Sequence, residues 1–113
     1  MEQHYRVQGR VWINGPEGTF IGYGRVILLE RIREHGSISA AARSMEMSYR
    51  HALKLVESMN RQSRNPVVEK TTGGRGGGGA VLTEAGERAI ECFWSVHRDF
   101  QEFLAGRSLQ LEL

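Results

Sequence analysis

The N-terminal residues of the chain alternate between apolar and polar side chains. This period of two is typical of a half-buried β-strand, and its apolar positions are Tyr5, Val7, Val11 and Ile13. Residues 14–18 (Asn-Gly-Pro-Glu-Gly) supply turn chemistry, and residues 19–21 can return as a short partner strand. We therefore expect a β-hairpin within residues 1–22.

The apolar pattern then changes to the period of a helix. Residues 25–35 place apolar side chains on one side, and Gly36 is expected to end this helix. A second, short helix is predicted from Ser39 to about Met45. Ser39 is its expected N-cap, and three consecutive alanines favour the helical state.

A third helix is predicted after a turn at Met47 and Ser48. Ser48 is placed to cap it, and the pattern extends to about Ser63. The expected buried face consists of Ala52, Leu55, Val56 and Met59, and the opposite face carries Arg50, Lys54, Glu57 and Arg61. Two short helices joined by a tight turn, the second with a basic outer face, indicate a helix-turn-helix within residues 24–64.

A second hairpin is predicted at residues 66–82. Pro66 stops the third helix, residues 67–70 have the pattern of a strand, and residues 80–82 can return as its partner. Six of the seven residues from Gly73 to Gly79 are glycine, so the tip of this hairpin is unusually rich in glycine. A hairpin directly behind a helix-turn-helix is expected to be a wing.

The last predicted helix, residues 83–105 with Thr83 as its cap, has more apolar surface than a small domain readily covers. Five residues alternate spacings of three and four, as in a coiled-coil seam, Ala89, Val96 and Phe103 form a parallel row, and Trp94 widens the patch. Large exposed apolar patches usually mark interfaces. We therefore predict a homodimer interface made of Ile90, Phe93, Trp94, His97, Phe100 and Leu104. Packing of the whole patch on the domain's own core is the alternative.

Together these elements predict one domain over residues 1–113. Its fold class is mainly α with small β-hairpins: a winged helix-turn-helix with an N-terminal β-hairpin and a long C-terminal dimerisation helix. A chain of 113 residues has room for one hydrophobic core and leaves no space for a separate catalytic module.

The composition indicates a soluble protein of the cytoplasm. No apolar run is long enough to cross a bilayer, and the N-terminus lacks the apolar stretch of a signal peptide. The one cysteine, Cys92, cannot form an internal disulfide, which suits a reducing compartment. Cys92 lies among apolar neighbours and is expected to be a small packing residue.

The charge is concentrated in the middle of the chain. The net charge is +2, but residues 37–75 hold seven Lys or Arg against three Asp or Glu, a local balance of +4, which leaves −2 for the remainder. A basic middle of this kind attracts polyanions such as DNA, although a solvated basic face gives the same count.

The glycine-rich loop invites comparison with phosphate-binding loops of enzymes. A P-loop ends in Gly-Lys-Ser/Thr and opens a helix, whereas this loop has no lysine and leads into a strand. A dinucleotide-binding loop needs a βαβ unit, which the pattern does not offer. Arg75 at the tip can instead contact a phosphate or enter a narrow minor groove, and a merely flexible loop is the alternative.

The third helix and the wing together supply the expected contacts to DNA. The first turn of the third helix would enter the major groove, where Arg50 and Lys54 can reach base edges or phosphates. Lys70 and Arg75 would anchor the wing. The complete expected DNA-binding set is Ser39, Ser48, Tyr49, Arg50, His51, Lys54, Lys70, Thr72 and Arg75.

No catalytic or metal site is predicted. The four histidines and the one cysteine have no ligand spacing, and no nucleophile motif is present. We expect no enzyme activity, no cofactor and no metal.

Several segments resemble one known family. The segments 36–42 (Gly-Ser-Ile-Ser-Ala-Ala-Ala), 47–50 (Met-Ser-Tyr-Arg), 59–60 (Met-Asn) and 72–83, the glycine-rich wing, resemble the N-terminal DNA-binding domain of ModE-type molybdate-dependent regulators. The start Leu-Thr-x-x-Gly at residues 82–86 resembles the related LysR-type winged helix. The resemblance spans residues 22–104 and implies a homodimeric transcription regulator whose long last helix forms much of the dimer interface.

The chain departs from that family at two places. Leu53 stands where the family tends to have a tryptophan in the third helix, and the chain ends at Leu113, where the family continues into oxyanion-binding domains. We therefore expect no carry-over of molybdate sensing. The expected function is a sequence-specific, homodimeric DNA-binding regulator of unknown effector. The alternatives are a protein-interaction module or a sensor of a small molecule or oxyanion on the same fold.

Overall fold

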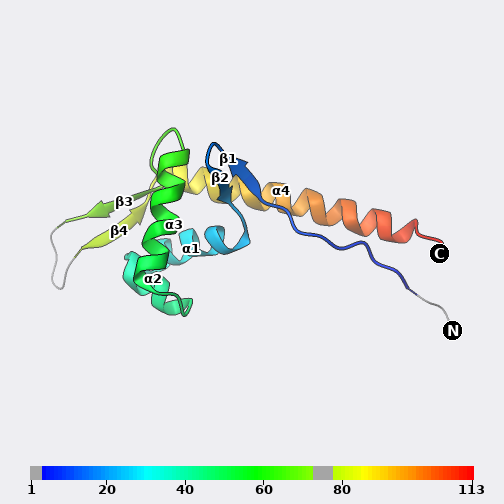
Figure 1. The fold of residues 1–113 in the computed structure, drawn as a ribbon, viewed down its shortest axis with the longest axis horizontal. Helices are drawn as coiled ribbons and strands as arrows, with labels where there is room; N and C mark the ends of the chain where they lie inside the picture. Colours follow the sequence, from blue (N-terminus) through cyan, green and yellow to red (C-terminus); the bar gives the residue numbers. More distant parts are fainter. Residues whose placement is uncertain (1–3, 73–77) are drawn as a thin grey trace.

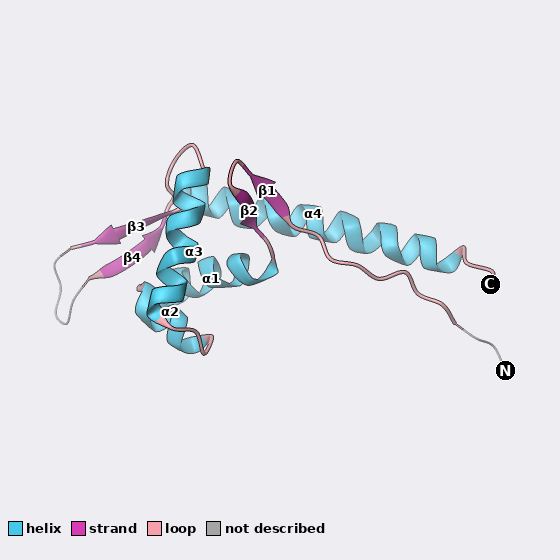
Figure 2. Ribbon diagram, viewed as in Figure 1, coloured by secondary structure: helices cyan, strands magenta, loops and turns pink. Residues whose placement is uncertain are grey.

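The computed structural model describes residues 4–72 and 78–113, and helices dominate it (Figure 1; Figure 2). Its elements are β1 (Ile13–Gly15), β2 (Gly18–Ile21), α1 (Tyr23–His35), α2 (Ile38–Ser44), α3 (Tyr49–Gln62), β3 (Val68–Thr71), β4 (Gly79–Leu82) and α4 (Glu84–Leu109). The predicted fold class, a winged helix-turn-helix with two small hairpins and a long C-terminal helix, is confirmed.

One hydrophobic core joins the helices. Helix α1 packs against α2, α4 and β4. Leu28 and Leu29 of α1, Met59 of α3 and Phe93 of α4 are fully buried members of one cluster. The helical period of the apolar residues therefore directs one stripe of each helix into a shared interior.

The helix-turn-helix is formed by α2, α3 and the turn at residues 45–48. Gly36 ends α1 in the left-handed conformation (φ +75°), as expected from its lack of a side chain. The prediction of Ser39 as the cap of α2 is wrong: Ser37 is the N-cap, and its hydroxyl accepts from the Ala40 N–H. Because Gly36 turns the chain at once, α2 begins two residues earlier than the alanine run alone indicates.

The wing is the antiparallel pair β3–β4, with Val68 opposite Leu82 and Thr71 opposite Gly79. In Figure 1 it projects from one end of the helical core, and α4 projects from the other end. Residues 73–77, which include the predicted tip residue Arg75, lie outside the described residues. Strand β4 of the wing is fixed to the end of α1, where the Ala80 N–H donates to the Gly36 carbonyl at 2.8 Å.

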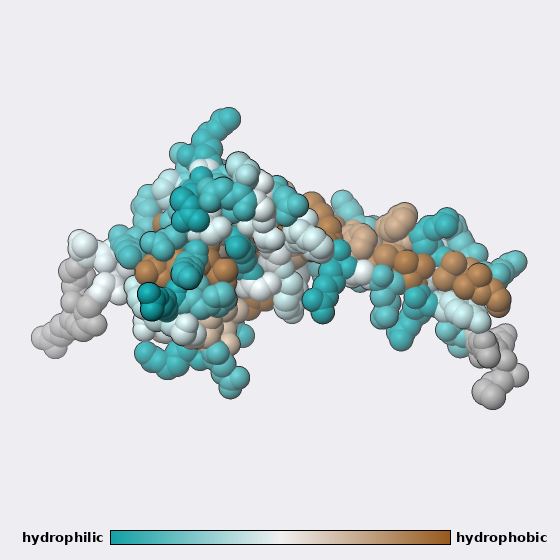
Figure 3. Space-filling view, in the orientation of Figure 1, coloured by the Kyte–Doolittle hydropathy of each residue, from teal (hydrophilic) through white to brown (hydrophobic). Residues whose placement is uncertain are grey.

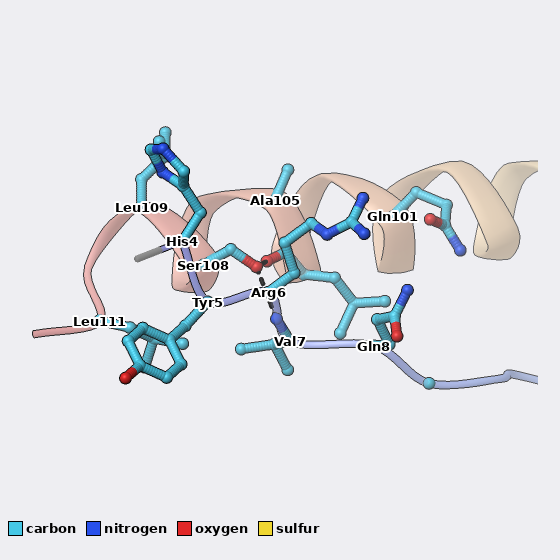
Figure 4. Close-up of a pocket in the computed structure, with 12 residues that line it drawn as sticks. His4, Tyr5, Arg6, Val7, Gln8, Gln101, Ala105, Ser108, Leu109 and Leu111 are labelled. Carbon is cyan, nitrogen blue, oxygen red and sulfur yellow. Dashed lines mark hydrogen bonds between the residues drawn. The ribbon is translucent and has the colours of Figure 1, made fainter. Parts of the chain in front are cut away.

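The N-terminal hairpin is shorter than predicted. Strand β1 begins at Ile13, and residues 4–12 (the N-terminal arm) run extended along α4 with no strand paired to them in the described part of the chain. The Val7 N–H donates to Ser108 Oγ at 2.7 Å (Figure 4). The arm, with its alternating apolar residues, therefore lies against helix α4 and not against a partner strand.

Helix α4 has 26 residues and extends beyond the predicted end at residue 105. Its first half enters the core, and its second half continues outward beside the arm, which gives the molecule extents of 63 × 30 × 20 Å (Figure 1). Cys92 is exposed on α4, so its expected role in packing is wrong. Within residues 4–72 and 78–113, no helix has both the length and the apolarity needed to span a membrane.

Candidate nucleic-acid interface

Helix α3 divides into a buried and an exposed face, as its pattern predicts. Ala52, Val56 and Met59 are buried, and the exposed residues are Tyr49, Arg50, His51, Lys54, Glu57 and Arg61. Positions four, seven and eleven residues apart lie on one side of a helix, so Arg50 and Lys54 share this outer face. The first two turns of α3 therefore present two cations and two polar rings to solvent.

The N-terminus of α3 is fixed by the predicted cap. The Ser48 hydroxyl oxygen accepts from the His51 N–H at 3.1 Å. The hydroxyl hydrogen is not used by this bond and can still donate to an acceptor outside the protein. The cap therefore orders the first turn of α3 without removing Ser48 as a donor.

A hollow of about 510 Å³ connects the start of α3 with the wing. It is lined by residues from α2, from α3 and from both strands of the wing: Ile38, Ser39, Tyr49, Lys70, Thr71, Thr72, Gly78, Gly79 and Ala80. Four of the nine residues predicted to bind DNA thus lie around one concavity. Residues far apart in the sequence form this surface because β4 is tied to the end of α1.

The cations of this surface are not neutralised by the protein. Within the described residues, Arg50, Lys54 and Lys70 form no ion pair and no side-chain hydrogen bond. None of the residues that line the hollow is acidic. The charges are therefore available to an external polyanion, the condition that phosphate binding requires.

Sequence reasoning missed the clamp at the end of α3. Asn60 Oδ1 accepts from the N–H groups of Val67 (2.8 Å) and Val68 (3.2 Å), and its Nδ2 donates to the Val68 carbonyl (3.1 Å). One amide side chain thus fixes β3 to α3. Only the Met-Asn pair at residues 59–60, which the family resemblance singled out, hinted at this role.

The N-terminal hairpin braces the same end of α3 from another side. Gln62 Nε2 donates to the Thr19 carbonyl (2.9 Å), and its Oε1 accepts from the Glu17 N–H (3.1 Å). Arg25 donates to the Thr19 carbonyl (2.8 Å) and to Ser58 Oγ (3.0 Å), and partial burial lowers the pKa of its guanidinium. The hairpin, whose role could not be predicted from the sequence, therefore positions α3.

Chain comparisons agree with this geometry. The profile of the family described as "bacterial regulatory helix-turn-helix protein, lysR family" matches residues 25–87, from α1 to the start of α4. The matched segment contains the helix-turn-helix and the wing, together with the hollow between them.

Several characterised proteins are similar to the chain. The molybdenum-pterin-binding protein MopB of Rhodobacter capsulatus is 42% identical over 96 residues, which cover 85% of this chain and 36% of MopB. The molybdenum transport protein ModE of Azotobacter vinelandii is 33% identical over 99 residues, or 88% of this chain and 37% of that protein.

The DNA-binding transcriptional dual regulator ModE of Escherichia coli K12 is 45% identical over 69 residues, or 61% of this chain and 26% of that protein. This chain thus spans roughly a quarter to a third of the length of these relatives. The resemblance to ModE-type regulators is confirmed for the segment that aligns.

Proposed function

The chain belongs to the lysR family of bacterial regulatory helix-turn-helix proteins, and from this premise we propose that it binds duplex DNA sequence-specifically as a homodimer. It carries the DNA-binding domain of a transcriptional regulator, and members of this family are regulators and not enzymes. The observation that supports the proposal is that the start of α3, which exposes Arg50 and Lys54, adjoins the hollow beside the wing, which Lys70 lines.

In the proposed complex, the first turns of α3 lie in the major groove. Arg50 and Lys54 contact base edges, since guanidinium and ammonium groups pair with the acceptors of guanine. The adjacent DNA backbone is contacted by Tyr49, His51 and the Ser48 hydroxyl. The unpaired N–H groups at the start of α3 face a phosphate. This assignment keeps every sequence-predicted contact of α3.

The wing contacts the flanking backbone or the minor groove. Lys70 and Thr72 line the same hollow as Tyr49 and Ser39. In the proposed complex, the sugar-phosphate backbone of one DNA strand follows this hollow from α3 to the wing. Arg75, predicted at the wing tip, extends the same contact in the proposal. A cation at the wing adds affinity with little sequence preference.

The proposed dimer uses the outer half of α4. Ile90 and Phe93 are 5% and 0% exposed within the protomer, and Leu104 is 8% exposed, so these three predicted interface residues belong to the protomer's own packing. Trp94 and His97 meet edge to face with 5.3 Å between ring centroids. Of the predicted set, Phe100 remains at the surface of the outer half, partly exposed.

Phe103, in the parallel apolar row, is the main exposed aromatic residue of α4, at 58% exposure. Val96, Phe100 and Phe103 follow spacings of four and three, so they share one face of the helix. The apolar surface of the outer half of α4 is visible in Figure 3. We place the contact between the two copies on this face, with Phe103 at its centre.

Replacing Phe103 by Asp is expected to convert the dimer to a monomer at micromolar concentration. A charge placed in an apolar contact loses its hydration, and the dissociation constant should rise by about 100-fold or more. Sedimentation equilibrium measures this constant. Ser95→Asp adds the same charge at an exposed position of α4 outside the apolar row, and it should leave the constant within a factor of about three. Equal constants for the two variants would contradict the proposed interface.

A homodimer presents two recognition helices, so the proposed binding site is palindromic with half-sites about one helical turn apart or a multiple of it. Selection of bound fragments from genomic DNA, followed by a salt-titrated gel shift, tests the proposal. A recovered palindrome whose affinity falls with salt supports it, and unchanged mobility of the whole pool would favour a protein-interaction module. The proposed compartment is the cytoplasm, where a bacterial chromosome is accessible.

A further inference from the structure

A second cavity lies between the N-terminal arm, the start of α1 and the middle of α4, and it shares no lining residue with the hollow beside the wing. Its volume is about 520 Å³, and it is lined by Gly9, Arg10, Val11, Trp12, Tyr23, Gly24, Phe93, His97 and Gln101. This size falls within the range of pockets that hold small organic molecules. The proposed DNA contacts use none of these residues.

The walls of this cavity are aromatic. Phe93 is fully buried at its base, whereas Trp12 of the arm and Tyr23 of α1 are 54% and 63% exposed. Tyr23 meets the ring of Trp94 edge to face with 5.9 Å between centroids, and this contact fixes its position. Trp12 packs against Gly22, where a Cβ atom would lie 3.2 Å from the tryptophan Cβ. Two large rings thus border the cavity with much of their surface uncovered.

The polar residues around the cavity favour an anion. Arg10, Gln101 and His97 are among the lining residues, and Arg10 is the one lysine or arginine in this set. None of the nine lining residues is acidic. The Glu30 carboxylate accepts from Trp94 Nε1 at 2.9 Å and is not part of the lining.

We propose that this cavity binds a planar aromatic carboxylate of one or two rings. The aromatic part of the ligand lies between Trp12 and Tyr23 above Phe93, in the offset or edge-on arrangements that aromatic rings prefer. The carboxylate pairs with Arg10, whose guanidinium geometry matches two carboxylate oxygens, and the Gln101 amide offers a further donor.

The proposed ligand site is linked to the end of α3 through the N-terminal hairpin. Arg10 and Trp12 directly precede β1, and the β1–β2 hairpin is bonded to the end of α3 through Gln62. His97 and Gln101 line the cavity, whereas Val96 and Phe103 of the proposed dimer contact lie on another face of α4, and Phe100 lies between them beside Gly9. The proposed ligand site and the proposed dimer contact are therefore neighbours that meet at Phe100.

Calorimetric titration of the purified protein with 1-naphthoate, in the absence of DNA, tests the site. The wild-type chain should bind one molecule per protomer saturably. The neutral 1-naphthamide, which has the same ring system, should bind at least about tenfold more weakly, because it forms no charged pair with Arg10. Arg10→Gln should lower the affinity for naphthoate by a similar factor and leave the affinity for naphthamide unchanged.

Arg6→Gln is the matched control. Arg6 lies in the same arm but lines a different hollow, towards the end of α4 (Figure 4), so this variant should bind naphthoate like the wild type. The proposal is overturned by no saturable binding to the wild-type chain, by equal binding of the acid and the amide, or by equal losses in the two arginine variants. Because no DNA is present, these results are independent of the proposed DNA binding.

Discussion

Replacing Gly86 by Ala is expected to lower the free energy of unfolding by about 2–3 kcal/mol, because the new methyl group has no space. Gly86 lies in the first turn of α4 and is buried against the root of the wing. A Cβ atom here would overlap the Val67 carbonyl oxygen and lie 2.8 Å from Leu82 Cγ. The Val67 oxygen also accepts from the Thr83 N–H, so it belongs to backbone that cannot easily move away.

The same replacement at Gly106 is the matched control within the same helix. Apart from its chain neighbours and the backbone of its own helix, no atom lies within 4 Å of a Cβ built at Gly106, so the variant only gains helix propensity, about 0.5–1 kcal/mol. Urea denaturation of the two variants should therefore move the midpoint in opposite directions. A loss of stability at Gly106 equal to that at Gly86 would show that general helix effects, and not the contact with the wing, determine the result.

Replacing Asn60 by Ala is expected to cost about 2–4 kcal/mol, since it leaves three backbone groups without their partners. Val67 and Val68 are 1% and 3% exposed, so water does not readily replace the lost amide. For a domain of this size, the midpoint of thermal unfolding should fall by roughly 10–15 °C. Asn60→Asp keeps the accepting oxygen but loses the donor to the Val68 carbonyl, and it should lie between the wild type and Asn60→Ala.

Asn65→Ala provides the control for Asn60. Asn65 is exposed, and no hydrogen bond of its side chain is seen among the described residues, so this variant should stay within about 0.5 kcal/mol of the wild type. Circular dichroism during thermal unfolding measures all three variants. Similar midpoints for the replacements at Asn60 and Asn65 would contradict the clamp between α3 and β3.

Local signals in the sequence predicted the helix ends with mixed success. Ser48 and Thr83 are the N-caps of α3 and α4, as predicted, because each directly precedes an unbroken helical pattern. Ser37 and Ser39 both precede the alanines of α2, and the sequence alone does not decide between them. The left-handed Gly36 decides it in the structure by turning the chain straight into the helix at Ile38.

The periodicity of the sequence predicted which face of each element is buried, but it did not predict which other element covers that face. The alternation in residues 5–13 is satisfied by the side of α4 and not by a second strand. The seam of α4 is likewise covered by the protomer itself at Ile90 and Phe93. A pattern of burial gives the exposed and covered faces of an element, whereas the covering element depends on contacts between residues distant in the sequence.

The candidate DNA surface was largely predictable because it consists of exposed, charged residues at a regular helical spacing. Arg50 and Lys54 are exposed on α3, and Ser39, Tyr49, Lys70 and Thr72 share one hollow. The groups that position this surface were not predictable. Asn60, Gln62 and Arg25 act through hydrogen bonds to backbone atoms of other elements, which leave no periodic signal in the sequence.

The most direct test of the account is the affinity of Arg50→Ala for a selected palindromic duplex and for a random duplex of equal length, measured by fluorescence anisotropy at one salt concentration. The loss on the selected duplex should be about 10-fold or more and the loss on the random duplex about threefold or less, because Arg50 is proposed to read bases. Lys70→Ala, a proposed phosphate contact, should weaken both duplexes equally. Equal losses for Arg50→Ala on both duplexes, or no preference of the wild-type chain for the selected one, would contradict sequence-specific recognition by α3.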